Sequence, residues 1–258
     1  MKQQQQPPLP WLDPGDPFPP LETAWGISNP APGLLAAGGV LDTATLLKAY
    51  SSGIFPWFSE GQPILWWSPD PRMVLKVQQF RLHRSMRKTL VAFTAQAGCE
   101  IRVDSCFAAV VRACANKSRN GQTGTWIVEE MISAYVALHQ SGHAHSVETW
   151  INGVLTGGLY CVNVGTMVFG ESMFAHSKDA SKIALSALVA WCGTNGIAWI
   201  DCQQNTKHLA SLGASEIPRN MFEEHVRHAA NQPTPAWLFS SHCLNQLLSK
   251  KIETCDRP

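Results

Sequence analysis

The sequence of 258 residues lacks the features of a membrane-spanning or exported protein. Although 45% of its residues are hydrophobic and only 15% are charged, it has no run of about 18 apolar residues, the length that a helix needs to cross a bilayer. The stretch from Lys2 through four glutamines to repeated prolines contains no apolar core of the kind that a secretory signal requires. We therefore expect a globular, cytoplasmic protein that does not contact membranes.

Metal and nucleotide signatures are also missing. The eight cysteines form no CxxC pair, and no cluster of cysteine and histidine has zinc-ligand spacing. We expect reduced thiols, with neither a disulfide nor a metal site. His143 and His145 share one face of a predicted strand without a third ligand, which favours ordinary hydrogen-bonding roles. Neither GxGxxG with its acidic partner nor GxxxxGK[ST] occurs, so we expect no bound nucleotide and no cofactor.

Acidic residues are scarce in one segment of the chain. Between Arg72 and Asn120, ten basic residues stand against Glu100 and Asp104, so this segment carries a charge of +8 while the whole chain carries +1. Such a block attracts a polyanion through its long-range field and by pairing with phosphates. A solvated basic surface produces the same pattern, and charge alone leaves both interpretations open.

The first third of the chain predicts a tail followed by a small domain. Residues 1–20 are rich in glutamine and proline with little to bury, which predicts a disordered or loosely attached tail. A helix is expected over 41–50, with Asp42 or Thr43 capping its start. Two strands dense in aromatic residues follow it. We expect a small N-terminal domain over residues 21–75.

The remainder, residues 76–258, predicts a larger α+β domain. Apolar residues at helical spacing indicate a helix over 131–140. Three strands then alternate with turns, one of which is the Asn152–Gly153 pair typical of hairpins. A helix over 178–194, a strand over 197–201 and a short helix complete the pattern. It indicates a mixed, mostly antiparallel sheet flanked by helices, compatible with the N-acetyltransferase-like fold.

Three polar residues stand where the predicted sheet would support chemistry. Asp201 and Gln203 come at the end of an apolar strand, where a carboxylate is well placed to meet a ligand. A capping role for Asp201 at the next helix is an equal alternative. Glu171 lies between apolar residues of a central strand, where a carboxylate must be paired or serve a ligand, and we favour a functional role. Cys161 and Cys202 lack an adjacent histidine base, so we expect no thiol nucleophile.

Several longer strings are more specific than these motifs. In chain order they are YSSGIFPWF at 50–58, PILWWSPDPR at 63–72, GTWI at 124–127, HAHSVE at 143–148, GESMF at 170–174, ASK at 180–182, IDCQ at 200–203 and SLGA at 211–214. Together they resemble the leucyl/phenylalanyl-tRNA–protein transferase family over about residues 30–240.

This resemblance implies an enzyme that moves Leu, Phe or Met from aminoacyl-tRNA to the N-terminal amine of proteins that begin with Arg or Lys, marking them for degradation. It also implies a small N-terminal domain, a larger acetyltransferase-like domain and a monomer. The basic block then meets tRNA, through residues that we assign as Arg81, Arg84, Arg87 and Lys88. The aminoacyl side chain is expected in a pocket lined by Trp57, Trp126, Leu159, Val168, Leu188 and Ile200.

Asp201 and Gln203 are the catalytic pair that the resemblance implies. In this hypothesis the neutral α-amine of the acceptor attacks the aminoacyl carbonyl, and the ribose of tRNA leaves without ATP or metal. Gln203 positions the amine through its carbonyl oxygen, while Asp201 orients Gln203 and stabilises positive charge developing on nitrogen. Glu171 is assigned to the Arg or Lys side chain of the acceptor, because a cation needs a fixed carboxylate.

Four residues depart from the family pattern. Val168 and Leu188 stand where the family has phenylalanines lining the pocket, so the pocket is expected to be wider and the donor preference is open. Cys161 replaces a glycine, and Thr206 stands where an asparagine is usual. Asp201 and Gln203 are retained.

Two other functions compete with this interpretation. An acyl-CoA-dependent N-acetyltransferase would use a similar sheet, but its pyrophosphate loop, Arg/Gln-x-x-Gly-x-Gly/Ala, is missing before Lys178. A tRNA-binding module without catalysis would show the same basic block. Such a module has no reason to keep Asp201 and Gln203 together at a strand end.

Overall fold

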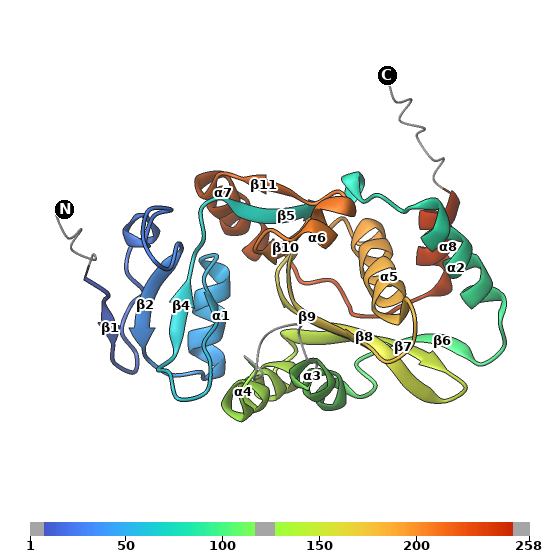
Figure 1. Cartoon of the computed structure of the whole chain (residues 1–258), viewed down its shortest axis with the longest axis horizontal. Coiled ribbons are helices and arrows are strands. Elements are labelled where there is room, and N and C mark those ends of the chain that lie inside the picture. Colours follow the sequence, from blue (N-terminus) through green and yellow to red (C-terminus); the bar gives the residue numbers. More distant parts are fainter. Residues whose placement is uncertain (1–7, 117–126, 250–258) are drawn as a thin grey trace, which may run out of the picture.

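Two β-sheets organise residues 8–116 and 127–249, which the computed structural model describes (Figure 1). The smaller sheet has the order β1 (Trp11–Leu12), β2 (Leu34–Gly38), β4 (Leu65–Trp67) and β3 (Phe55–Pro56). The larger sheet has the order β11 (Ser215–Ile217), β5 (Arg72–Lys76), β10 (Trp199–Gln203), β9 (Met167–Ala175), β8 (Val154–Val164), β7 (Ala144–Ile151) and β6 (Cys99–Val103).

Eight α-helices of the described residues surround these sheets. They are α1 (Thr43–Ser51), α2 (Arg84–Ala95), α3 (Phe107–Ala115), α4 (Glu129–Gln140), α5 (Ala180–Thr194), α6 (Lys207–Ser211), α7 (Arg219–Ala230) and α8 (Ser241–Ser249). Two 3-10 turns lie at Leu21–Thr23 and Val77–Gln79. None of the described helices is long and apolar enough to cross a membrane.

The larger sheet confirms the predicted α+β class. Among its described strands, β9 and β10 run parallel and every other neighbouring pair is antiparallel, so the sheet is mixed and mostly antiparallel. Successive side chains of a strand point to opposite faces. In β8, Leu159 and Cys161 accordingly pack with α5, while Tyr160 and Val162 pack with α3 and α4. Figure 1 shows helices on both faces of the sheet.

Helix α1 connects the smaller sheet to the larger one. Asp42 caps it as predicted, accepting a hydrogen bond from the Thr45 amide at 2.7 Å, which satisfies one of the free amides at a helix start. The buried face of α1 contacts α4 and β8. This face places the fully buried Tyr50 beside the larger sheet.

Residues 8–20 correct the expectation of a loose tail. β1 pairs in parallel with β2, and the Ala37 amide donates to the Pro10 carbonyl at 2.9 Å. Leu12 is buried, and the Phe18 ring meets the Trp66 ring edge to face at 4.8 Å. Composition misled because a few apolar side chains between the prolines suffice to anchor this segment, which is otherwise largely exposed, on the smaller sheet. Residues 1–7 lie outside the described part of the chain.

The chain leaves the smaller sheet just before the predicted boundary at residue 75. β4 ends at Trp67, and β5 begins at Arg72 as a strand of the larger sheet between β10 and β11. The change of sheet therefore occurs over residues 68–71. This short connection brings the smaller sheet against the end of β10.

Gly213 lies in the tightly packed connection from α6 to β11, and a substitution there would show how tight this packing is. At its φ of +97°, a Cβ atom would lie 2.2 Å from the Gln79 carbonyl oxygen, whereas at Gly196, with φ of +70°, a Cβ atom would meet nothing within 4 Å. We expect Gly196→Ala to lose about 1 kcal/mol from the left-handed conformation alone. Gly213→Ala should lose roughly 3 kcal/mol because the backbone must also shift. Urea unfolding measures the free energy of unfolding of both variants. Equal losses in Gly196→Ala and Gly213→Ala would contradict the close packing around Gly213.

Candidate active site

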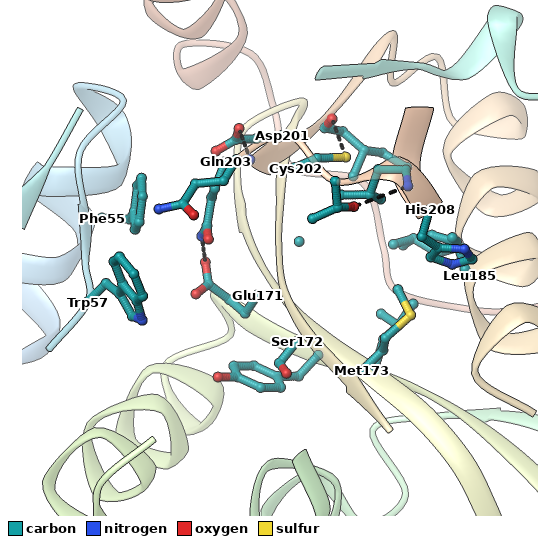
Figure 2. A pocket seen from close by; sticks show the side chains of 18 residues that line it. Phe55, Trp57, Glu171, Ser172, Met173, Leu185, Asp201, Cys202, Gln203 and His208 are labelled. Atoms are coloured by element: carbon teal, nitrogen blue, oxygen red, sulfur yellow. Dashed lines mark hydrogen bonds between the residues drawn. The ribbon is translucent and has the colours of Figure 1, made fainter. Parts of the chain in front are cut away.

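A pocket opens where β9 and β10 separate. Both strands lie within the described residues, and they pair at only two positions, Val168 with Ile200 and Phe169 with Asp201. Beyond these pairs the pocket occupies about 390 Å³. Figure 2 shows Glu171 and Gln203 on the side of Phe55 and Trp57, with Met173 and Leu185 on the opposite side. Its lining residues come from β3, β8, β9, α5, β10 and α6.

A bulge in each of these strands shapes the polar side of the pocket. Against β8, Tyr160 pairs with Ser172 and Cys161 with Gly170, which leaves Glu171 as the extra residue of β9. The register between β10 and β5 also shifts, so that Cys202 is the extra residue before Gln203. Bulges redirect side chains and are common beside active sites. Here they turn Glu171 and Gln203 toward each other.

Gln203 is held in a strained backbone conformation. Its φ is +62°, in the left-handed region that non-glycine residues rarely adopt. The backbone amide of Gln203 donates a hydrogen bond to Asp201 Oδ1 at 2.9 Å. Strain of this kind persists only where surrounding contacts enforce it, and it is found at functional sites. Asp201 supplies the contact that holds Gln203 in place.

Asp201 forms a buried ion pair with Arg72 of β5. Arg72 Nε donates to Oδ1 at 2.8 Å and Nη2 donates to Oδ2 at 2.6 Å, and both side chains are fully buried. A buried charge is tolerated only with such a partner. Asp201 is among the residues that line the pocket, but both of its oxygens already accept hydrogen bonds and its side chain is fully buried.

Arg72 also joins the smaller sheet to this site. Its Nη1 donates to the Gly53 carbonyl at 3.1 Å. Its guanidinium carbon lies 4.8 Å from the centre of the Phe55 ring and 4.5 Å from that of Phe222, so that one aromatic ring comes from β3 and the other from α7. Cation–π contacts gain strength when they are desolvated.

Glu171 gathers three hydrogen-bond donors from three elements. Its Oε1 accepts from Tyr50 of α1 at 2.8 Å and from Gln203 Nε2 at 3.1 Å, and its Oε2 accepts from Tyr135 of α4 at 2.9 Å. The two phenol oxygens are 2.7 Å apart. The side chains of α1, α4 and β10 therefore converge on one carboxylate at the polar side of the pocket.

Burial dominates the electrostatics of this cluster. The pKa of Glu171 is raised to about 7, mainly by desolvation and to a lesser extent by the nearby Asp201 charge, while hydrogen bonds from Tyr50, Tyr135 and Gln203 lower it. Desolvation also raises the pKa of the Cys202 thiol to about 12. Cys202 is thus a poor nucleophile, and Glu171 changes its protonation near neutral pH.

The structure brings most of the predicted pocket residues together. Trp57, Leu159, Leu188 and Ile200 line the pocket with Glu171 and Gln203. Val168 is fully buried beside Ile200 and lies outside the lining residues. Trp126 falls outside the described residues, so its predicted role has no structural counterpart here.

Sequence reasoning missed three residues that hold the site. Arg72 lies within the string PILWWSPDPR and Tyr50 within YSSGIFPWF, but neither string indicates which side chain turns inward. Tyr135 is one of several buried residues on α4. The number of tyrosines was a usable signal, because the chain has only three and two of them contact Glu171.

The four predicted tRNA-binding residues have different environments. Arg81, Arg84 and Lys88 are exposed on and just before α2. Arg87 is half-buried, and its Nη1 donates to the Leu248 carbonyl near the end of α8. The last carbonyl groups of a helix have no partner within the helix, and the Arg87 guanidinium supplies a donor to one of them at the end of α8. Arg87 therefore has a structural role in addition to any contact with a polyanion.

His145 has neighbours that its position in the sequence did not reveal. The ligand atoms of Asp104, His139 and His145 all lie within 4.8 Å of one another, and this group does not include His143, the residue paired with His145 in the sequence analysis. Hydrogen bonds already join these groups. His145 Nδ1 lies 2.7 Å from Asp104 Oδ2, and His139 Nδ1 lies 2.8 Å from the Ala144 carbonyl. These contacts fit the hydrogen-bonding role predicted for His145.

The fold and the site define the class of protein. Apolar walls that can hold a side chain, with a carboxylate and an amide converging at one side, are the features of an enzyme pocket on an α+β scaffold. A family model described as leucyl/phenylalanyl-tRNA protein transferase matches residues 74–227, and a model of its N-terminal domain matches residues 39–70. The chain belongs to the leucyl/phenylalanyl-tRNA–protein transferase family and is an aminoacyltransferase.

Similar proteins named leucyl/phenylalanyl-tRNA–protein transferase match over nearly their full length. The protein of Polaromonas sp. (strain JS666) is 60% identical, with 96% of this chain and 97% of that protein covered. The protein of Albidiferax ferrireducens is 59% identical, with 95% and 96% covered. The protein of Burkholderia vietnamiensis is 56% identical, with 93% and 94% covered.

Solved structures overlap more loosely. A GCN5-related N-acetyltransferase from Kribbella flavida is 9% identical with a TM-score of 0.31, over 64% of this chain and 56% of that chain. L-PGS from Bacillus licheniformis is 11% identical with a TM-score of 0.35, over 74% and 64%. Overlaps of this extent carry no argument about function.

The Arg72–Asp201 pair should behave unlike an exposed pair of the same geometry. We expect Arg72→Met or Asp201→Leu alone to lose about 3–5 kcal/mol of unfolding free energy, because each leaves a buried charge unpaired. The double variant should recover much of that loss. Removing the exposed bidentate pair of Arg112 and Glu129 should leave the unfolding midpoint nearly unchanged. Urea unfolding of wild type and these four variants measures the losses, and strictly additive losses in the buried pair would contradict this view.

Proposed function

We propose that the protein transfers Leu, Phe or Met from aminoacyl-tRNA to the N-terminal α-amine of proteins that begin with Arg or Lys, marking them for degradation. We place this activity in the cytoplasm and assign it to a monomer. The observation that carries the proposal is the pocket itself, with apolar walls on one side and Glu171 and Gln203 on the other. Family membership supports the aminoacyl donor.

The apolar walls suit a long, unbranched or aromatic side chain. Leu159, Leu185, Leu188 and Ile200 are buried among the lining residues, and Met173 faces the same space. Burial of such a group contributes about 25 cal/mol per Å² of apolar surface. Burying a charged side chain among these apolar residues would cost its desolvation, so we expect acidic and basic donors to be disfavoured.

Gln203 is the residue that we assign to the acceptor amine. It is half-buried at the pocket, and its Nε2 already donates to Glu171 at 3.1 Å, which directs its carbonyl oxygen away from Glu171. That oxygen is available to accept a hydrogen bond from the amine. Fixing the amine close to the ester carbonyl supplies much of the acceleration of such a reaction.

Asp201 has an indirect role in this proposal. Its oxygens are occupied by Arg72 and by the Gln203 backbone amide, so it is a positioning residue for Gln203. This revises the hypothesis that Asp201 stabilises positive charge on the reacting nitrogen. The reaction remains the aminolysis of an ester by the neutral amine, in which a C–N bond forms, the bond from the carbonyl carbon to the ribose oxygen breaks, and one proton passes from the nitrogen to that oxygen.

The direct test is transfer from purified donors. We expect radiolabelled Leu, Phe or Met to pass from its tRNA to an Arg-headed peptide without ATP or acetyl-CoA, because the ester supplies the driving force. Leu188→Phe should lower transfer of Phe relative to Leu and Met by narrowing the pocket. Absence of transfer from all three donors, with tRNA binding confirmed, would refute the function, and an unchanged donor ratio would refute the pocket assignment.

Exposed cations of α2 should contribute to tRNA affinity through phosphate contacts. We expect Arg84→Ala and Lys88→Ala each to weaken tRNA binding and to reduce the slope of log affinity against log salt concentration by roughly 1. Arg87→Ala should mainly lower the unfolding midpoint, since this side chain holds α8. Fluorescence anisotropy across a salt series measures the slopes. A slope unchanged in both exposed variants would remove α2 from the tRNA surface.

A further inference from the structure

Helix α6 lies between the candidate pocket and the basic segment that leads into α2. Thr206 caps this helix by accepting a hydrogen bond from the Leu209 amide at 3.2 Å, and Thr206, His208 and Leu209 all line the pocket. Figure 2 shows His208 beside Leu185 at the wall of the pocket. Because α6 has five residues, it spans only roughly 7 Å. The far end of α6 is therefore little more than one helical turn from the pocket.

The far end of α6 contacts the basic segment directly. The Arg81 amide donates a hydrogen bond to the Leu212 carbonyl at 2.8 Å, and Nε2 of His83 lies 2.9 Å from the Ser211 carbonyl oxygen. These contacts fix the end of α6 against the residues that lead from β5 into α2 (Figure 1). A ligand that reaches from α2 to the pocket by this route passes over α6.

Lys207 is the one lysine or arginine of α6. It stands between two residues that line the pocket, yet it is exposed and is not itself a lining residue. Its side chain therefore lies outside the pocket, at the rim. Among the ion pairs of the described residues, none involves Lys207, Arg81, Arg84 or Lys88. These four exposed cations have no carboxylate partner there.

Acidic residues are absent from both segments that form this route. Residues 71–99 contain no aspartate or glutamate, and residues 202–215 contain none either. An anionic chain laid over these two segments meets cations and no carboxylate from either of them. The fields of neighbouring cations add over such a surface and favour a polyanion.

We propose that Lys207 binds a backbone phosphate in the unpaired 3′ end of the aminoacyl-tRNA, which runs from α2 along α6 to the pocket. This inference rests on the transfer function proposed above, because the 3′-terminal ribose carries the aminoacyl ester. With the ester at the pocket, the preceding nucleotides leave over its rim. Lys207 then meets phosphates close to the ester, and Arg84 and Lys88 meet phosphates farther away. A lysine ammonium group is a compact cation suited to a single phosphate at an exposed site.

The salt dependence of tRNA binding tests this contact. Lys207→Ala should lower the slope of log affinity against log salt concentration by about 0.7, the value for one phosphate of a single strand. Binding should then weaken about fivefold at 0.1 M salt and hardly at all at 1 M salt. Lys207→Arg keeps the charge and should keep the slope. Lys48→Ala, at an exposed site on α1, is the matched control, and thermal melting checks that each variant folds.

Modified tRNA locates the phosphate. A methylphosphonate linkage carries no charge, so a series of single replacements in the 3′ end should include one that weakens binding to wild-type protein. The same replacement should have little further effect on Lys207→Ala, because both changes remove one shared contact. Replacements in the base-paired acceptor stem should weaken binding to wild-type protein and Lys207→Ala alike. Arg84→Ala should show the reverse pattern.

Several results would overturn the role of Lys207. They are an unchanged slope in Lys207→Ala, a loss of affinity that is equally large at 1 M salt, and additive losses for Lys207→Ala with every replacement in the 3′ end. All of these measurements need binding only. Wild-type protein that binds tRNA as described but transfers no aminoacyl group would overturn the proposed function and leave the contact established. Active wild-type protein with an unchanged slope in Lys207→Ala would overturn the contact alone.

Discussion

The buried ion pair of Arg72 and Asp201 is the contact on which the site depends. It joins the first strand after the smaller sheet to the strand that ends at the pocket, and it is enclosed by the rings of Phe55 and Phe222. Neither charge can remain buried without the other. The pair therefore fixes the relative position of β3, β5, β10 and α7, which all meet around it. The strained Gln203 is held by the carboxylate of this pair.

The parallel pairing of β9 and β10 explains why the pocket forms at this place. Two antiparallel strands joined by a tight turn remain paired along their length, whereas β9 and β10 are connected through α5 and pair at only two positions. Each strand bulges next to the point of separation. Where the two strands separate, their backbone groups lose each other as hydrogen-bond partners. Side chains of both strands fill the space instead and form the wall of the pocket.

The elements were more predictable than the contacts between them. The helix capped by Asp42, the meander and the mixed sheet follow from periodicity and turn residues, and each depends on nearby residues only. The partnership of Arg72 with Asp201 spans 129 positions and that of Tyr50 with Glu171 spans 121, and no local pattern carries it. The loose tail was mispredicted for the same reason, because Leu12 is buried and Phe18 is half-buried by partners distant in sequence.

Three buried carboxylates of the described residues differ in the partners that hold them. Glu148, in the string HAHSVE, accepts from Ser105, the Cys106 amide, Ser146 and Trp150, which fills its four positions and ties β7 to the start of α3. Asp201 is fixed by an ion pair and fully enclosed. Glu171 and Asp201 each receive three donors and both line the pocket, but Asp201 is fully buried in its ion pair, whereas Glu171 keeps 9% of its surface exposed. Neither burial nor the number of donors separates Glu171 from Asp201; the ion pair of Asp201 and the partial exposure of Glu171 at the pocket do.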